Sequence, residues 1–130
     1  MDESFDLTSA RGIKLPFIED DQDILEAIRT ILNNKGFTVE TSDNLVDIKD
    51  IAGFKPDLIL SDLSLKNKKG DSFVSEIKAD KKIGNIPLII VSGQSLETIT
   101  RIAKELKISA YLQKPFNMED LLNIVAKSTG

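Results

Sequence analysis

Four apolar runs of the chain each end in side chains that can bind a cation or an anion. In chain order, these side chains are Glu19-Asp20, Asp62, Ser92 and Lys114. Carboxylates are hard oxygen ligands, which Mg²⁺, Mn²⁺ and Ca²⁺ prefer. The chain contains no His and no Cys, so zinc sites built on those residues and catalysis by a histidine base are excluded. The residues therefore favour chemistry carried by carboxylates, a hydroxyl and an ammonium group.

These side chains meet only if the apolar runs form a parallel sheet. Short apolar runs alternate with stretches whose apolar residues recur at helical spacing, which predicts five strand–helix units. The expected strands are 13–18, 37–41, 58–60, 86–91 and 110–113, and the expected helices are 23–34, 45–53, a segment after Gly70, 99–106 and 118–125. Right-handed connections between parallel strands place helices on both faces of the sheet. An eight-unit barrel needs ~250 residues, so we expect an open, doubly wound α/β sheet.

The length of the chain indicates its domain organisation, and its charge limits the classes of partner that it can bind. The chain has 130 residues, with 17 Lys and Arg against 21 Asp and Glu, and a net charge of −4. This length predicts one domain at 13–130 after a polar N-terminal arm at 1–12. The negative charge argues against contact with nucleic acid, whose phosphates require Lys and Arg. No apolar run is long enough to span a membrane, and we expect a cytoplasmic protein.

Electrostatics predicts a cation among the carboxylates. The carboxyl ends of parallel strands meet at one edge of the sheet, where ligands of such folds bind. Two carboxylates ~4 Å apart repel each other by about 4 kcal/mol at an effective dielectric constant of 20. Either their pKa values rise or a cation lies between them. The set Glu19, Asp20, Asp62 and Lys114 therefore predicts a site for Mg²⁺, Mn²⁺ or Ca²⁺.

From about Leu15 to Lys127, the chain resembles the receiver domain of two-component response regulators, in the CheY-like superfamily. The residues that carry the resemblance are Glu19-Asp20, Asp62 with Gly70 downstream, Ser92-Gly93 and Tyr111-Leu112-Gln113-Lys114-Pro115-Phe116. Their order and their positions at strand ends are specific in combination. The resemblance implies a flavodoxin-like fold with strand order 2-1-3-4-5 and a cis peptide bond before Pro115.

The resemblance also implies an activity. Asp62 would accept a phosphoryl group from the phosphohistidine of a sensor histidine kinase or phosphotransfer domain. Mg²⁺ (or Mn²⁺) would be held by Asp20 and Asp62, by the backbone carbonyl of Ser64, and by Glu19 through water. Lys114 would contact a phosphoryl oxygen. The protein would thus catalyse its own phosphorylation and dephosphorylation, without turning over small molecules.

A switch is implied as well. The Ser92 hydroxyl would move to the phosphoryl group, and the Tyr111 ring would turn inward behind it. The fourth helix, fifth strand and fifth helix would then present a changed surface to a downstream effector or output domain. Ser64 and Gln94 match family positions that tune dephosphorylation. A phosphorylation-dependent dimer is left open by the sequence.

Other interpretations remain open. The chief alternative is a receiver-like interaction module that works without phosphorylation of Asp62. A flavodoxin-like electron carrier is disfavoured because the acidic loop 19–21 would repel the phosphate of a flavin cofactor, and an aspartate-nucleophile phosphatase because Ser64 replaces its second Asp. Two departures from the family are a basic loop at Lys66–Lys69 and Pro16. We expect Pro16 to distort the first strand locally, because proline cannot donate a hydrogen bond.

Overall fold

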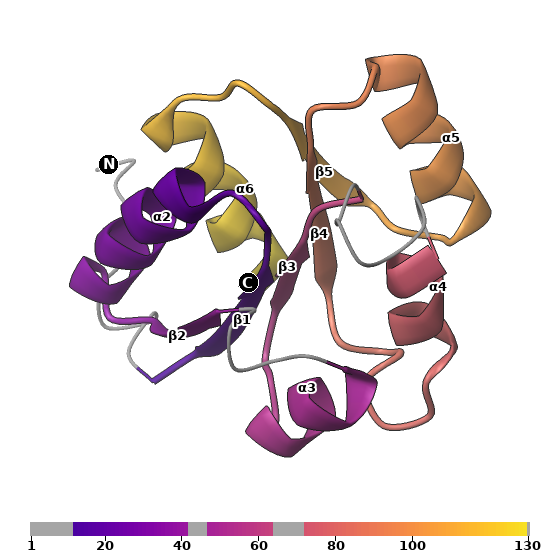
Figure 1. Cartoon of the computed structure of the whole chain (residues 1–130), viewed down its shortest axis with the longest axis horizontal. Coiled ribbons are helices and arrows are strands. Elements are labelled where there is room, and N and C mark those ends of the chain that lie inside the picture. The colour runs from indigo at the N-terminus through magenta and orange to yellow at the C-terminus, as the bar shows by residue number, and fades with distance from the viewer. Residues whose placement is uncertain (1–11, 42–46, 64–71, 130) are drawn as a thin grey trace.

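The computed structural model describes residues 12–41, 47–63 and 72–129 (Figure 1). The strands are β1 (Lys14–Ile18), β2 (Thr38–Thr41), β3 (Ile59–Ser61), β4 (Leu88–Ser92) and β5 (Ala110–Gln113). The helices are α2 (Gln22–Asn34), α3 (Ile48–Phe54), α4 (Ser72–Ala79), α5 (Leu96–Glu105) and α6 (Met118–Thr129). Strands and helices alternate along the chain, as the apolar pattern predicts.

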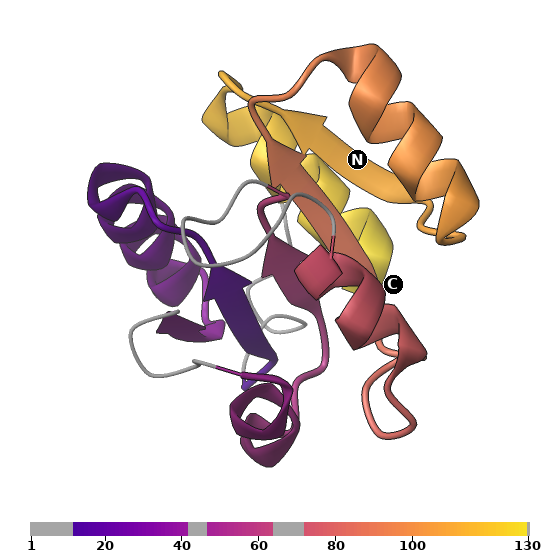
Figure 2. The same cartoon turned by 45° about the vertical axis from the view of Figure 1, so that its right-hand side comes forward.

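The five strands form one parallel sheet with the order β2-β1-β3-β4-β5. Figures 1 and 2 show helices on both faces of the sheet, with α2 and α6 on one face and α3, α4 and α5 on the other. This arrangement confirms the doubly wound sheet and its strand order. It also brings the carboxyl ends of β1, β3, β4 and β5 to the same edge.

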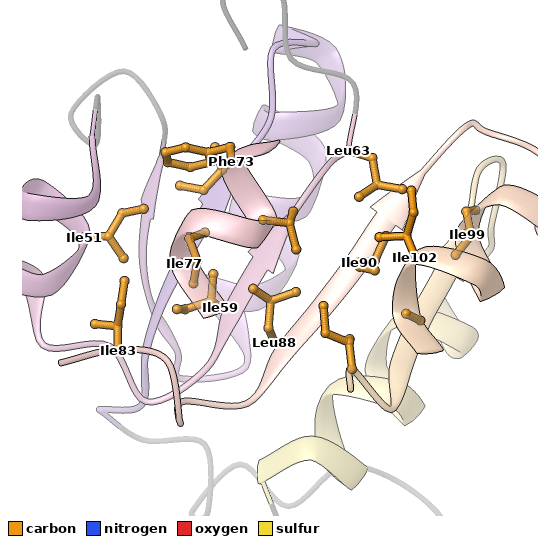
Figure 3. Packing of buried hydrophobic residues seen from close by; sticks show 14 residues of the cluster. Ile51, Ile59, Leu63, Phe73, Ile77, Ile83, Leu88, Ile90, Ile99 and Ile102 are labelled. Carbon is orange, nitrogen blue, oxygen red and sulfur yellow. The ribbon is translucent and has the colours of Figure 1, made fainter. Parts of the chain in front are cut away.

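Two hydrophobic clusters hold the helices to the sheet. Neighbouring positions of a strand point to opposite faces, so Phe17 of β1 packs with α2 and α6, whereas Ile18 packs with α3, α4 and α5. Figure 3 shows the cluster between the sheet and helices α3, α4 and α5. In this cluster, Ile59 and Ile90 of the sheet lie under Ile77 of α4 and Ile102 of α5. Both faces of the central strands are therefore buried, as in other parallel sheets.

Helix α2 is bounded at both ends by specific hydrogen bonds. The Asp21 side chain caps its start by accepting from the amides of Asp23 and Ile24 at 3.0 and 3.2 Å. At its end, Gly36 adopts a positive φ of 104°, and Phe37 N donates to the Leu32 carbonyl at 3.1 Å. Glycine suits this left-handed position. The cap at Asp21 fixes the start of α2 directly after the acidic pair.

Strand β1 runs through Pro16 without interruption. Its pairing with β2 includes Pro16 opposite Glu40, whereas its paired positions with β3 are Phe17 and Ile18. Ahead of them, the Lys14 carbonyl accepts from the amides of Asp57 and Leu58. Pro16 therefore does not interrupt the pairing with β2, and the end of β1, which Glu19 follows, is paired on both sides.

Some predicted features lie outside the described residues. They are the arm up to residue 11, the start of the second predicted helix at Leu45, Ser64, the basic loop Lys66–Lys69 and Gly70. Within the described part, α3 begins at Ile48, where Asp47 and Asp50 form a reciprocal capping box.

Candidate functional site

The carboxyl edge of the sheet gathers the predicted polar residues. Glu19 follows β1, Asp62 follows β3, Ser92 ends β4, and Lys114 follows β5. The carboxyl-bearing residues Glu19 and Asp62 are 2 % and 5 % exposed, and Ser92 is fully buried. Four separate strands thus place ionisable and hydroxyl side chains in one confined space.

Lys114 joins the two buried carboxylates. Its Nζ donates to Oε1 of Glu19 at 2.5 Å and to Oδ2 of Asp62 at 2.9 Å. The lysine side chain is itself only 18 % exposed. Because both oxygens contact one nitrogen, the carboxylates lie close enough to repel each other strongly without it. The ammonium therefore neutralises charge at the point where the two acids meet.

Backbone amides fix the orientation of Glu19. Its second oxygen, Oε2, accepts from the amides of Asp20 and Asp21, both at 3.0 Å. Asp20 is partly exposed, and within the described part of the chain it does not complete a metal-type cluster of three acidic side chains. The structure therefore brings Glu19, Asp62 and Lys114 into direct contact and leaves Asp20 at the rim of the site.

The buried ion pairs shift two pKa values. Burial raises the pKa of the Glu19 carboxyl above its ordinary value of 4.5, and the hydrogen bond from Lys114 offsets part of this rise. For Lys114, burial alone lowers the pKa, but the hydrogen bonds to Glu19 and Asp62 outweigh it, so the pKa lies above 10.5. Lys114 is therefore an ammonium ion at neutral pH.

Ser92 is tied to both neighbouring loops. Its Oγ accepts from the Gln94 amide at 3.1 Å, and its carbonyl accepts from the Lys114 amide at 2.7 Å. The Gln94 carbonyl in turn accepts from Nε2 of Gln113 at 3.0 Å. The peptide bond between Lys114 and Pro115 is cis, which confirms the expectation from the resemblance. These bonds hold the ends of β4 and β5 together beside Asp62.

Tyr111 lies farther back on β5. It is partly buried and packs against the cluster of α3, α4 and α5, opposite Ile90 of β4. Ser64, the remaining predicted ligand, lies outside the described residues. The roles predicted for Tyr111 and Ser64 stay predictions, since the structure gives the position of Tyr111 alone.

Sequence reasoning missed the direct contact between Glu19 and Lys114. The prediction assigned Glu19 to a water-mediated metal contact and Lys114 to a phosphoryl oxygen. The signal was present in the charge count, because Lys114 is the only cation among the predicted site residues. A buried carboxylate requires a partner, and this lysine is the cation that the fold brings to it.

The donor set fits a hard divalent cation. Glu19, Asp20 and Asp62 supply only carboxylate oxygens, and neither imidazole nor thiolate is available in this chain. Mg²⁺ is typically bound by one or two carboxylates together with waters and phosphate oxygens. The two buried acids together with the adjacent Asp20 therefore match the ligands that Mg²⁺ or Mn²⁺ prefers.

The fold and the site define a flavodoxin-like α/β protein with an acidic site and one lysine at the carboxyl edge of its sheet. The family model of the response regulator receiver domain matches residues 16–126. The chain therefore belongs to the response regulator receiver family of two-component signalling, as the motifs predict.

Relatives and solved structures agree with this assignment. The transcriptional regulatory protein KdpE of Staphylococcus aureus is 34% identical over 109 residues, which cover 83% of this chain and 46% of KdpE. The receiver domain of the sensor histidine kinase PA1611 from Pseudomonas aeruginosa, solved with a coordinated magnesium ion, has a TM-score of 0.79 at 24% identity. The match covers 92% of this chain and 98% of that one. CheY4 of Vibrio cholerae has a TM-score of 0.76 at 21% identity, covering 90% and 98%.

The chain spans about half the length of most of the curated relatives, including 48% of GltR of Pseudomonas aeruginosa, and only 7% of a hybrid histidine kinase of Dictyostelium discoideum. Receiver domains in general interact with histidine kinases and output domains. None of the helices in the described ranges has the length and apolar character needed to cross a membrane.

Proposed function

We propose that Asp62 accepts a phosphoryl group from the phosphohistidine of a sensor histidine kinase or phosphotransfer domain. The observation that carries this proposal is the position of the Lys114 ammonium, 2.9 Å from Oδ2 of Asp62. As the O–P bond to Asp62 forms, the N–P bond of the donor breaks and the donor nitrogen keeps the electron pair. An ionised carboxylate needs no general base for this attack, which suits a chain without histidine.

Lys114 would act by charge neutralisation. Phosphoryl transfer places negative charge on the oxygens of the moving group, and catalysis rests mainly on positioning and electrostatic stabilisation. An ammonium already held beside Asp62 by Glu19 is positioned for that task before the donor arrives. Glu19 is therefore proposed as a positioning residue for Lys114.

Asp20, Asp62 and the backbone carbonyl of Ser64 are proposed as direct ligands of Mg²⁺ or Mn²⁺, and Glu19 as a ligand through water. When bound, the ion would neutralise charge on the phosphoryl oxygens. The proposal is supported by the carboxylates of this site and by two relatives. The PA1611 receiver domain contains magnesium in its active site cleft, and the response regulator Rcp1 was solved in a Mn²⁺-bound form at 22% identity and a TM-score of 0.67.

The output is proposed to pass through Ser92 and Tyr111 to the surface formed by α5, β5 and α6. The Ser92 hydroxyl would turn toward the phosphoryl group, and the Tyr111 ring would follow inward. This surface carries two exposed large hydrophobic side chains, Leu96 and Met118. A downstream effector or an output domain is the proposed partner, and Ser64 with Gln94 is proposed to tune dephosphorylation.

The test is phosphorylation in Mg²⁺ with acetyl phosphate, followed at once by intact-mass measurement. We expect a gain of one phosphoryl group, loss of that gain in Asp62→Asn, and loss of it when the metal is chelated. Asp57→Asn is the matched control, because Asp57 is an exposed aspartate on the opposite edge of the sheet. An unmodified wild-type chain would instead favour an interaction module that works without phosphorylation.

A further inference from the structure

A groove lies at the edge of the sheet opposite Asp62. It has a volume of about 1100 Å³ and is formed by α3, the residues that lead into β3, and the segment 80–86 between α4 and β4. Figures 1 and 2 show α3 and this segment side by side beyond the starts of β3 and β4. We call it the α3 groove. It shares no residue with the site at Asp62.

Lysines surround the α3 groove. Lys49 and Lys55 line it from α3 and its end, and Lys81 and Lys82 line it from the opposite segment. All four side chains are exposed, and none forms an ion pair with a residue in the described ranges. The lining carries four ammonium groups against two carboxylates, and this excess of positive charge favours the binding of anions.

The two aspartates that line the groove accept hydrogen bonds from backbone amides. Oδ2 of Asp57 accepts from the Lys14 amide at 2.9 Å. Oδ2 of Asp80 accepts from the amides of Lys82 and Ile83 at 2.8 and 3.0 Å. These carboxylates thus stabilise the loops, and the lining keeps an excess of lysine in a chain whose net charge is −4.

The floor of the α3 groove is apolar, and a buried side chain and a tight turn fix its position. Ile48 and Ala52 of α3 face Ile83 and Ile86 across it, and Ile83 is buried in the core. A side chain at Gly84 would clash with the Asp80 carbonyl, so this turn is tight. No aromatic side chain occurs among the described lining residues, whereas single-stranded nucleic acids bind by stacking bases on aromatic rings. Aliphatic side chains fit this floor better than bases.

We propose that the α3 groove is a docking site for an acidic segment of a partner protein. Aliphatic side chains of that segment pack on the isoleucine and alanine floor, and its carboxylates pair with the lysines at the rim. The alternation of apolar floor and basic rim matches an acidic, amphipathic peptide. This docking is independent of phosphoryl transfer to Asp62, because the two sites lie at opposite edges of the sheet.

The test uses the ¹⁵N-labelled full chain and a short synthetic peptide in which Asp and Glu alternate with Leu. We expect amide shifts at Gly53, Lys55 and Lys82, and at least a tenfold loss of affinity in Lys55→Glu/Lys82→Glu. The matched control is Lys104→Glu/Lys107→Glu, which changes the net charge equally. Lys107 has a φ of 58° and Lys55 a φ of 56°, so both pairs alter one left-handed position. The control should change affinity less than twofold.

Four outcomes would overturn the proposal. They are no binding of the acidic peptide, an equal loss of affinity in the control variant, equal binding of a peptide with Asn and Gln in place of the acids, and tighter binding of single-stranded DNA than of the acidic peptide. Acetyl phosphate labelling of the Lys55→Glu/Lys82→Glu variant should match that of the wild type. A failed docking test is therefore distinguishable from a failure of the proposed phosphoryl transfer.

Discussion

Lys114 Nζ lies 2.9 Å from Oδ2 of Asp62, although the two residues are 52 positions apart in the chain. The contact depends on the parallel order of β3, β4 and β5, which brings the ends of non-adjacent strands to one edge. Glu19 reaches the same ammonium from β1. The site therefore depends on the order of the strands in the whole sheet.

Replacing the lysine should destabilise the fold. Lys114→Met leaves two buried carboxylates facing each other, and removing one partner of a buried ion pair costs about 3 kcal/mol. We expect a loss of this size in the free energy of urea-induced unfolding at neutral pH in the absence of divalent cations. Lys104→Met, at an exposed position of α5, is the matched control and should change stability by less than about 0.5 kcal/mol. Equal stability of the two variants would contradict the ion pair.

The same substitution should raise the pKa of Glu19 further. Burial already raises this pKa, and the hydrogen bond from Lys114 opposes the rise. Its removal leaves burial and repulsion by Asp62 acting in the same direction. The measurement is a ¹³C NMR titration of the Glu19 carboxyl carbon in both proteins, with Glu19→Gln identifying the resonance.

The sign of the associated stability change follows from linkage. A carboxyl whose pKa is raised by folding adds stability below its ordinary value of 4.5, and that contribution is lost as the pH rises through the folded pKa. In Lys114→Met, the loss should therefore extend to higher pH than in the wild type. A Glu19 pKa that falls in the variant would show that the lysine does not stabilise the carboxylate.

Divalent metal should stabilise the folded chain. Mg²⁺ at ten times its dissociation constant adds ~1.4 kcal/mol to the free energy of unfolding. We expect thermal unfolding to shift upward on addition of Mg²⁺ and to return on chelation. Asp20→Asn should remove most of the shift, whereas Asp23→Asn, in the exposed first turn of α2, should keep it. A full shift in Asp20→Asn would remove Asp20 from the proposed ligands.

Ser92 and Ser95 make similar hydrogen bonds, but only Ser92 is proposed to act in the switch, whereas Ser95 caps α5. The Ser92 hydroxyl accepts from the Gln94 amide and the Ser95 hydroxyl from the Thr98 amide, both at 3.1 Å. Each Ser→Ala substitution should cost about 1 kcal/mol in unfolding free energy. Only Ser92→Ala should abolish the change in the Tyr111 ring resonances on phosphorylation, measured by NMR. If Ser95→Ala abolishes it equally, the proposed route through Ser92 is wrong.

Much of the fold could be predicted from local patterns. Helical spacing of apolar residues located α2, α5 and α6, because one apolar stripe per helix must face the sheet. Gly36 marked the end of α2, and Pro87 comes directly before β4. The predicted boundaries differ from the observed ones by a few residues, since strand ends depend on neighbours that are remote in sequence.

The sequence predicted which residues form the site better than it predicted the contacts between them. The positions of Glu19, Asp62, Ser92 and Lys114 at strand ends are enough to place them at one edge. The choice of Lys114 as the direct partner of Glu19 depends on side-chain rotamers and on the amides of Asp20 and Asp21, which orient the carboxylate. Sequence spacing does not encode such rotamers.

The backbone of Lys114 has a mechanical consequence. Its amide donates to the Ser92 carbonyl at 2.7 Å, while its ammonium reaches Asp62. Lys114 thus forms an ion pair with the aspartate through its side chain and joins the ends of β4 and β5 through its backbone. One residue therefore links the end of β3 to the ends of β4 and β5, through its side chain at Asp62 and through its backbone at Ser92.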